Sequence, residues 1–309
     1  TDSDKPTQIW TQGETESSSA WFPTIDKPNQ KTTQEIYMTV PDKYVTLSNG
    51  IMKSSTKVSG GLRTDHWVMD KKHAPYLFFM GVGEYAVVKD KWRNIEVDYY
   101  VEKEYEPFAK QIFGNTPEMI EFFSKRLSYD YPWSKYAQIT GRDFVSGAME
   151  NTTATLHQES AQQKPGDLID ENRWEDTIAH ELFHHWFGDL VTAESWSNLT
   201  VNESFANYSQ YLWNEHKYGK DIADYGLMKE IKGYMMDPSN ISKDLVRFNY
   251  HSREDMFDGV SYNKGGAILH MLRNYVGDDA FFAGLTDYLK TNEFGTGEAH
   301  QLRLSLEKV

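Results

Sequence analysis

The chain has no cysteine among its 309 residues. A protein without thiols has no disulfide framework and no thiolate metal site, so any zinc ion must be held by histidine and carboxylate side chains. The sequence also has no apolar run long enough to span a membrane, and no signal-peptide pattern opens it. Because proteins without cysteine occur in the cytosol, in the periplasm and outside cells, these absences leave the compartment undetermined.

Basic residues are few relative to acidic ones. The 32 Lys and Arg residues against 46 Asp and Glu residues give a formal net charge of -14, and no basic cluster is long enough to follow a phosphate backbone. We therefore expect neither nucleic acids nor anionic membranes as partners. Hydrophobic residues make up 39% of the chain and aromatic residues 14%, which excludes a disordered protein. A globular chain of this length is expected to form two domains.

Short alternating segments dominate the first hundred residues. In residues 35–40, the side chains of Ile36, Met38 and Val40 fall on one face of an extended segment. Similar segments follow, separated by Gly, Asn and Asp, and they predict an antiparallel sheet domain over residues 1–102. The predicted strands are residues 35–40, 45–47, 66–69, 76–80 and 85–88, and residues 10–26 are expected to be mostly loop.

From residue 103 the hydrophobic period changes to that of helices. Gly188 and Gly219 follow two apolar-periodic segments and are expected to end helices there. Two strands upstream of these helices predict a mixed sheet, so the fold class is α+β and the second domain spans residues 103–309. The predicted strands are 135–139 and 144–145, and the predicted helices are 118–127, 174–187, 201–218, 221–236, 263–276, 279–290 and 297–309.

The motif His180-Glu-x-x-His184 lies on the first of the two central helices. Residues four apart share one face of a helix, so the two imidazoles can bind one metal ion. Glu181 is turned about 100° away from His180 and can instead accept a proton from water at that metal. Glu203, on the following helix, is the candidate third ligand, and two His with one Glu leave a fourth position open, as in hydrolytic zinc sites. The alternative is that both histidines are ordinary members of a helix that buries apolar side chains.

Three motifs in one order give the chain a family resemblance. Glu203 follows His184 after eighteen residues, Gly147-Ala-Met-Glu-Asn151 lies upstream, and Ser261-Tyr-Asn-Lys-Gly265 lies downstream. With Thr11-Gln12 and residues 21–26, this order resembles the gluzincin zinc aminopeptidases, which include aminopeptidase N and the leukotriene-hydrolysing aminopeptidase. The resemblance implies that residues 1–102 are the C-terminal part of a saddle-like antiparallel β domain, and that residues 103–309 form a thermolysin-like mixed α/β zinc catalytic domain. In the family the catalytic domain normally continues past Val309 and a helical C-terminal domain usually follows, so we expect this chain to be a fragment that is truncated within the catalytic domain and lacks the helical domain.

The resemblance also implies the substrate and its contacts. Glu150, assisted by Gln12, is expected to bind the free α-amine of a peptide substrate, and Gly147-Ala148 is expected to run beside the substrate backbone. Tyr262 is expected to donate a hydrogen bond to the oxyanion that forms during hydrolysis. The expected site is completed by two further residues of the upstream motif and by one zinc ion per chain with its three ligands: Met149 and Asn151, and His180, His184 and Glu203.

Four positions differ from the family's common pattern. Ser204 stands where a glycine usually follows the glutamate ligand, and Thr200 stands where an aromatic residue is common. His185 and Asp189 also differ from the commonest residues. None of the four is a proposed ligand or base, so we expect these differences to affect the surroundings of the site.

The predicted function is hydrolysis of the N-terminal peptide bond of peptides by zinc-activated water attack, with Glu181 as the base. A zinc endopeptidase on the same scaffold is one alternative, and it would not need Glu150. A zinc-binding scaffold without turnover is another, as is a chain that is inactive because its C-terminal part is absent. The sequence leaves the preferred first residue and the oligomeric state undetermined.

Overall fold

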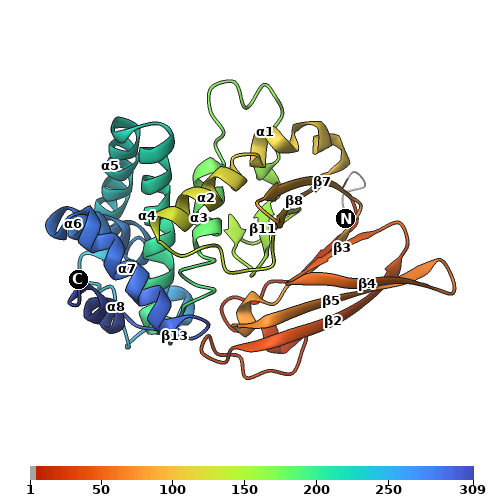
Figure 1. The fold of residues 1–309 in the computed structure, drawn as a ribbon, viewed down its shortest axis with the longest axis horizontal. Helices are drawn as coiled ribbons and strands as arrows, with labels where there is room; N and C mark the ends of the chain where they lie inside the picture. The colour runs from red at the N-terminus through yellow and green to blue at the C-terminus, as the bar shows by residue number, and fades with distance from the viewer. Residues whose placement is uncertain (1–4) are drawn as a thin grey trace. The chain divides into compact units, whose positions relative to one another are not determined.

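The computed structural model describes residues 5–309, and their backbone contacts divide them into two compact units. The first unit contains residues 5–26, 30–120 and 133–178, and the second contains residues 27–29, 121–132 and 179–309. Strands make up most of the regular structure of the first unit, and helices make up most of the second (Figure 1). The predicted α+β class is confirmed.

Two antiparallel sheets are formed by the early strands of the first unit. These strands are β1 Gln8–Trp10, β2 Thr32–Pro41, β3 Val45–Ser48, β4 Ile51–Val58, β5 Leu62–His73 and β6 Met80–Gly83. In one sheet β5 lies between β2 and β4, and in the other β6 lies between β1 and β3. The alternation predicted for residues 35–40 is present in β2, where Met38 and Val40 are buried and Tyr37 is exposed.

A five-stranded mixed sheet completes the first unit. Its strands are β7 Tyr85–Trp92, β8 Ile95–Glu102, β9 Lys135–Gly141, β10 Ala148–Met149 and β11 Ala154–Gln158, in the order β10-β11-β9-β8-β7. Strand β9 runs parallel to both of its neighbours, whereas the edge strands β10 and β7 are antiparallel to theirs. All seven residues of β9 are buried, as is typical of a parallel strand covered on both faces. The edge strand β10 carries part of the motif at residues 147–151.

Two of the predicted strands are wrong. Residues 75–77 form a short 3-10 helix, because Pro75 supplies the backbone angle of a first helical position, and β6 begins only at Met80. Residues 144–145 follow Asp143, whose positive φ of 57° turns the chain. The strands β4 and β8 were not predicted, because β4 is exposed at every position and β8 is buried at six successive positions, so neither alternates.

Helices α4 to α8 belong to the second unit, and α2 and α3 have residues in both units. Helix α4 contacts α5 and α6, and α7 contacts α6 and α8 (Figure 1). The helices predicted over 201–218, 221–236 and 279–290 are confirmed. The bounds are α1 Ala109–Phe113, α2 Thr116–Arg126, α3 Glu175–Phe183, α4 Thr200–Lys217, α5 Lys220–Met236, α6 Gly265–Val276, α7 Asp278–Asn292 and α8 Ala299–Leu306.

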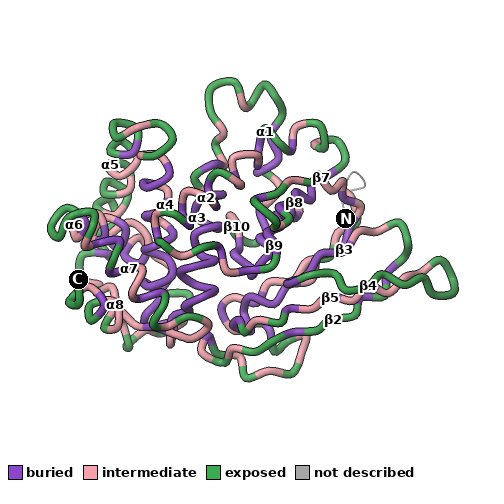
Figure 2. The backbone as a smooth tube through the Cα atoms, viewed as in Figure 1, coloured by how far each residue is buried: buried purple, intermediate pink, exposed green. Residues whose placement is uncertain are grey.

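Aromatic side chains fill the core of the second unit. Phe183, Trp186 and Phe187 near the end of α3 are buried, as are Trp213 on α4 and Tyr288 on α7. Most of α4 is buried, whereas Ala223 is the one buried residue of α5 (Figure 2). No helix formed by residues 5–309 is both long enough and apolar enough to cross a bilayer. Helix α4 is therefore a largely buried element of this unit, and α5 and α6 pack against it.

Lys135, at the start of β9, is a buried cation in the first unit. Its Nζ donates hydrogen bonds to the carbonyl oxygen of Ser48 at 2.8 Å and to Oγ1 of Thr153 at 3.0 Å, and it lies 5.1 Å from the ring centroid of Trp67. Burial lowers the pKa of Lys135 from 10.5 to about 7, although the carboxylate of Asp98 acts in the opposite direction. Folding and proton binding are therefore coupled at this lysine.

We expect Lys135→Met to flatten the pH dependence of the free energy of unfolding. Above about pH 7 the folded chain releases the proton of Lys135, while the unfolded chain keeps it until about pH 10.5. Stability contributed by this site therefore rises with pH across that interval, by at most about 1.4 kcal/mol per pH unit, and is lowest below it. Urea unfolding at several pH values measures the slope, with the exposed Lys91→Met as control. Equal slopes in the wild type and in Lys135→Met would rule out this coupling.

Candidate active site

The helix α3 carries His180 and ends at Phe183, four residues before its predicted end at 187. His184 lies in the turn directly after it. In this turn the amide of His185 donates to the carbonyl oxygen of Leu182 at 3.1 Å, which is a three-residue bond of the 3-10 type. The prediction of α-helix over residues 184–187 is wrong because the last turn tightens in this way.

Gly188 closes the turn that follows α3. Its φ is 142°, and a Cβ at this position would lie 3.1 Å from Nδ1 of His184. The Gly188 amide donates to the carbonyl oxygen of Val191 at 2.8 Å. Because L side chains rarely adopt this φ, and a Cβ would also crowd the imidazole, the position favours glycine. Gly188 therefore shapes the surroundings of His184 and does not itself end α3.

Helix α4 is held against the end of α3 by packing and by a hydrogen bond. Phe205 stacks on Phe187 with ring centroids 4.2 Å apart and ring planes 4° apart. Further along α4, the hydroxyl of Ser209 donates to the carbonyl oxygen of Ala179 at 3.2 Å. Glu203 lies in the first turn of α4, two residues before the stacked phenylalanine. These contacts determine where its carboxylate lies relative to the two histidines.

The two imidazoles converge on one carboxylate oxygen. Nε2 of His180 and Nε2 of His184 each lie 3.3 Å from Oε2 of Glu203. The two rings are 4.8 Å apart at 73°, so they face the carboxylate from different directions. All three side chains are buried, and each offers one ligand atom within 4.8 Å of the other two. The structure thus brings the three predicted metal ligands together.

The outer nitrogens of both rings have partners. Nδ1 of His184 lies 3.0 Å from the carbonyl oxygen of Phe187 and can only donate to it, which leaves Nε2 with a free electron pair. The side-chain amide of Gln210 lies 3.0 Å from Nδ1 of His180. In this structure the amide nitrogen Nε2 of Gln210 faces Nδ1; an amide turned by 180° would present its oxygen there, accept the Nδ1 proton and leave Nε2 able to bind a metal ion. This is the tautomer that a metal ligand needs.

The environment also favours the protonation states that bind a metal. Burial lowers the pKa of His180, which keeps its imidazole neutral. Burial alone would raise the pKa of Glu203, but a protonated His184 and the hydrogen bonds that the two histidines donate from Nε2 outweigh it and lower that pKa to about 2. A metal ion held here would take the place of those Nε2 protons. A metal site requires a neutral imidazole and an ionised carboxylate in these positions.

The donor set and its spacing fit a tetrahedral zinc ion. Ligands about 2.0–2.1 Å from such an ion lie about 3.3 Å from one another, and the two measured N to O distances are 3.3 Å. Three protein ligands of the types His, His and Glu leave one position for water or substrate. The alternative of two ordinary helix histidines does not account for this convergence.

His185 and Asp189, two of the positions that differ from the family's pattern, form a buried pair next to the main chain of Glu181. Nδ1 of His185 lies 3.2 Å from the carbonyl oxygen of Glu181, to which it donates, and Nε2 lies 3.6 Å from Oδ2 of Asp189. His185 and Asp189 are fully buried, and the His185 ring stacks on Tyr131 with centroids 5.7 Å apart. This buried pair supports the main chain at the predicted base. Glu181 itself is buried on α3, directly after the first histidine.

Tyr262 lies in a π-helical turn, Val260–Lys264, that leads into α6. The helix predicted from residue 263 thus begins as this wider turn, a feature that is often found at functional sites. The Tyr262 ring is nearly parallel to that of His180, with centroids 6.0 Å apart and planes 12° apart. Its amide donates to the carbonyl oxygen of Asp258 at 3.1 Å. The predicted oxyanion donor therefore lies beside a predicted metal ligand within the second unit.

The predicted amine-binding residues share the first unit. Gln12 donates from Nε2 to Sδ of Met149 at 3.1 Å, and the hydroxyl of Tyr76 donates to Oε1 of Glu150 at 3.4 Å. Met149, Glu150 and Asn151 are buried, whereas a Cβ on Gly147 would meet no atom within 4 Å. Ala148 and Met149 form the edge strand β10, which pairs with β11 on one side. Gly147 directly precedes β10, so there is also open space beside the start of this edge strand.

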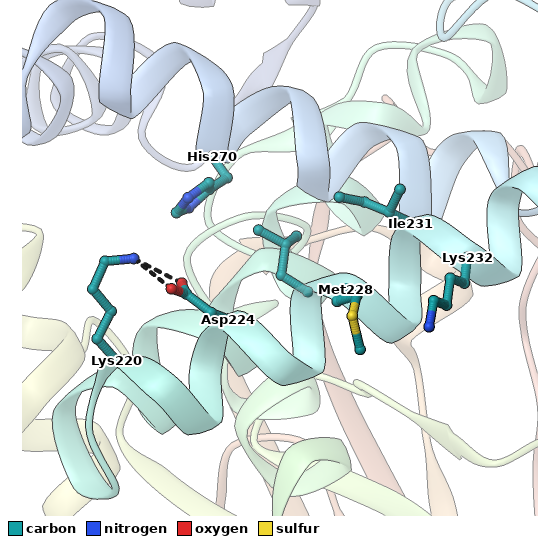
Figure 3. A pocket seen from close by; sticks show the side chains of 7 residues that line it. Lys220, Asp224, Met228, Ile231, Lys232 and His270 are labelled. Atoms are coloured by element: carbon teal, nitrogen blue, oxygen red, sulfur yellow. Dashed lines mark hydrogen bonds and ion pairs between the residues drawn. The ribbon is translucent and has the colours of Figure 1, made fainter.

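A groove on the second unit shares no residue with this site. Its volume is about 510 Å³, and its one carboxylate, Asp224, is paired with Lys220 at 2.7 Å (Figure 3). The groove therefore offers no set of metal ligands. The residues that line it, from α5 and α6, are Lys220, Asp224, Leu227, Met228, Ile231, Lys232 and His270.

The chain matches two known protein-family models. The Peptidase family M1 domain matches residues 112–309, which include the three convergent side chains, Glu181 and Tyr262. The chain belongs to peptidase family M1. The Peptidase M1 N-terminal domain matches residues 1–77 of the same chain. The resemblance to the gluzincin aminopeptidases is thereby confirmed at the level of the family.

Several named proteins are similar to this chain along nearly all of it. Endoplasmic reticulum aminopeptidase 1 of Homo sapiens is 31% identical over 306 residues, which cover 97% of this chain and 32% of that protein. Tricorn protease-interacting factor F2 of Thermoplasma acidophilum is 30% identical over 315 residues, covering 98% and 39%. Glutamyl aminopeptidase of Sus scrofa is 29% identical over 301 residues, covering 93% and 31%. The M1 chain thus spans between 31% and 39% of the length of these relatives.

Proposed function

We propose that the chain is the catalytic part of a zinc aminopeptidase that removes the first residue of peptides. The observation that carries this proposal is the convergence of His180, His184 and Glu203 in a chain of family M1. One zinc ion per chain, held by these three residues, would polarise the scissile carbonyl and lower the pKa of water to about 7.

The chain's own groups would move the proton. Glu181 takes a proton from the attacking water and passes it to the nitrogen of the leaving amine as the C–N bond breaks. Its burial, and the His185 hydrogen bond to its main-chain carbonyl, restrict the positions that the carboxylate can take. Tyr262 donates its phenolic hydrogen to the oxygen that becomes negative during the attack. Glu181 thus transfers the proton that the water releases, and Tyr262 stabilises the oxygen that becomes negative.

Recognition of the N-terminus would depend on residues of the first unit. Glu150 is a buried carboxylate that accepts a hydrogen bond from Tyr76, and its negative charge is suited to bind the α-ammonium of a peptide as well. Gln12 contacts Met149, the residue before Glu150, and its side-chain oxygen would be a second acceptor for the substrate amine. The substrate backbone would add to the edge strand β10. Only the first peptide bond would then reach the reacting groups.

A panel of aminoacyl chromogenic amides tests this proposal, each with a free or an acetylated amine. We expect cleavage of the free amides only, because the acetyl group removes the charge that Glu150 binds. Glu150→Gln should lower kcat/KM for the free amides by about 10- to 100-fold, the loss typical of a charged hydrogen bond, whereas the control Glu159→Gln should not. Cleavage of both series in the wild type would indicate an endopeptidase. Cleavage of neither, with zinc bound, would indicate a scaffold or an incomplete enzyme.

A further inference from the structure

Two residues that differ from the family's pattern form a hydrogen-bonded chain in the second unit. Oγ of Ser204 donates to the carbonyl oxygen of Ser261 at 2.6 Å, and Oγ1 of Thr200 lies 2.6 Å from Oγ of Ser204. Because the single proton of the Ser204 hydroxyl points to Ser261, the Thr200 hydroxyl must be the donor in the second bond. All three residues are buried. The chain ends on the peptide group that directly precedes Tyr262.

The π-helical turn and α4 approach each other closely at this point. A Cβ on Gly265 would lie 1.8 Å from Oγ of Ser204, so only glycine fits where the turn ends. The Ser204 hydroxyl therefore lies in the narrow space between the backbone of α4 and the backbone of the turn. It lies on α4 directly after Glu203, the residue on which the two imidazoles converge.

The other end of the turn is held separately. The amides of Val260 and Ser261 donate to Oδ1 of Asp258 at 3.0 and 3.2 Å, and Asp258 is itself paired with Lys243 and Arg247. These contacts fix where the turn begins. They do not connect it to α4, which the Ser204 hydrogen bond does. Glu230 of α5 also links the two, because it accepts hydrogen bonds from Asn207 on α4 and Asn263 in the turn. The Ser204 hydrogen bond, however, is a direct connection and reaches the peptide group next to Tyr262.

We propose that Ser204 is a positioning residue that sets Tyr262 relative to Glu203, with Thr200 orienting its hydroxyl. Its effect on turnover rests on the proposed function, because Tyr262 matters only if an oxyanion forms there. Its effect on the turn does not. A displacement of a donor by a fraction of an ångström weakens transition-state binding while leaving substrate binding nearly unchanged.

Steady-state kinetics tests the connection between Ser204 and Tyr262. We expect Ser204→Ala to lower kcat about tenfold, with KM and the zinc content within about twofold of the wild type. Tyr262→Phe should lower kcat by about 100-fold or more. In the Tyr262→Phe background, Ser204→Ala should cause no further loss, because the group that it positions is already gone. If the two losses multiply, Ser204 does not act through Tyr262 and the proposal is overturned.

Hydrogen exchange of the zinc-free protein gives a measurement that does not depend on activity. Ser204→Ala should accelerate exchange in peptides that cover residues 257–265, and Thr200→Val should do so less, because it leaves the Ser204 to Ser261 bond in place. The control Thr286→Val removes a hydroxyl that donates to the carbonyl oxygen of Leu127 at 2.7 Å in the same unit, and it should leave the turn unchanged.

The two measurements separate this proposal from the proposed function. A wild-type protein that cleaves no amide would defeat the aminopeptidase assignment, while the exchange data would still decide whether Ser204 holds the turn. Unchanged exchange in residues 257–265 of Ser204→Ala would overturn the positioning role even in an active enzyme. Faster exchange across the whole second unit would also overturn it, since the serine would then be a general stability element.

Discussion

Glu181→Gln should lower turnover of a free aminoacyl amide by about 10³-fold while zinc binding stays intact. Glutamine has the shape of glutamate but cannot accept the proton of the attacking water. The side chain does not belong to the group of three that converges between α3 and α4, so the ligand set is unchanged. The loss should therefore fall on kcat and leave KM nearly constant.

Glu175→Gln is the matched control for this variant. Glu175 is a buried glutamate on the same helix, and it accepts a hydrogen bond from Nδ2 of Asn115 at 3.2 Å. The control makes the same chemical change in α3 and should keep turnover within about twofold, as is usual for a residue outside the reacting groups. A zinc-loaded Glu181→Gln protein with near-normal turnover would refute the role of Glu181 as base.

Glu203→Ala should weaken zinc binding by more than about 100-fold, which exceeds the loss typical of residues that only orient a ligand. The change removes one of three ligand atoms and leaves two buried imidazoles facing an empty space. Gln210→Leu should weaken zinc binding by about 10- to 100-fold, because it removes only the partner of Nδ1 of His180. Competition with a chelator of known affinity measures both constants.

The order of these two effects is the informative result. If Glu203→Ala binds zinc as tightly as the wild type, the metal is not held by the group that the structure brings together. If Gln210→Leu has the larger effect, the amide of Gln210 does more than orient the histidine. Glu215→Gln, further along α4 and paired with Arg273 at 2.8 Å, controls for changes in the helix itself.

The three side chains that converge could be predicted because their spacing is a local property. His180 and His184 lie one turn apart, and Glu203 follows them at a distance that a second helix can span. Gln210 was missed, although it lies seven residues after Glu203 and so on the same face of α4. The spacing of two helical turns between Glu203 and Gln210 was the feature of the sequence that could have revealed this contact. The carbonyl oxygen of Phe187 gives no signal in the sequence, because every residue has one.

The roles of Ser204 and Thr200 could not be predicted in the same way. The sequence shows only that they differ from a family pattern, whereas their hydrogen bonds depend on how closely the turn at Ser261 approaches α4. Such approaches are tertiary contacts and leave no periodic pattern. The π-helical form of that turn was missed for the same reason.

The errors in the fold have local physical causes. Residues 76–80 are apolar enough for a strand, but Pro75 starts a 3-10 helix there. Strand β8 is buried on both faces and strand β4 on neither, so the alternation that reveals β2 is missing from both. The predicted boundary at residue 102 remains a prediction. The residues just before it, in β8, pair with β9 of the mixed sheet.

The most direct test of the account is a titration of the metal-free chain with zinc while cleavage of a free aminoacyl amide is followed. We predict that turnover rises in proportion to added zinc and reaches its plateau at one zinc per chain, and that the acetylated amide is not cleaved at any point. Turnover that does not depend on zinc, or a plateau at a different stoichiometry, would contradict a single hydrolytic site built from His180, His184 and Glu203.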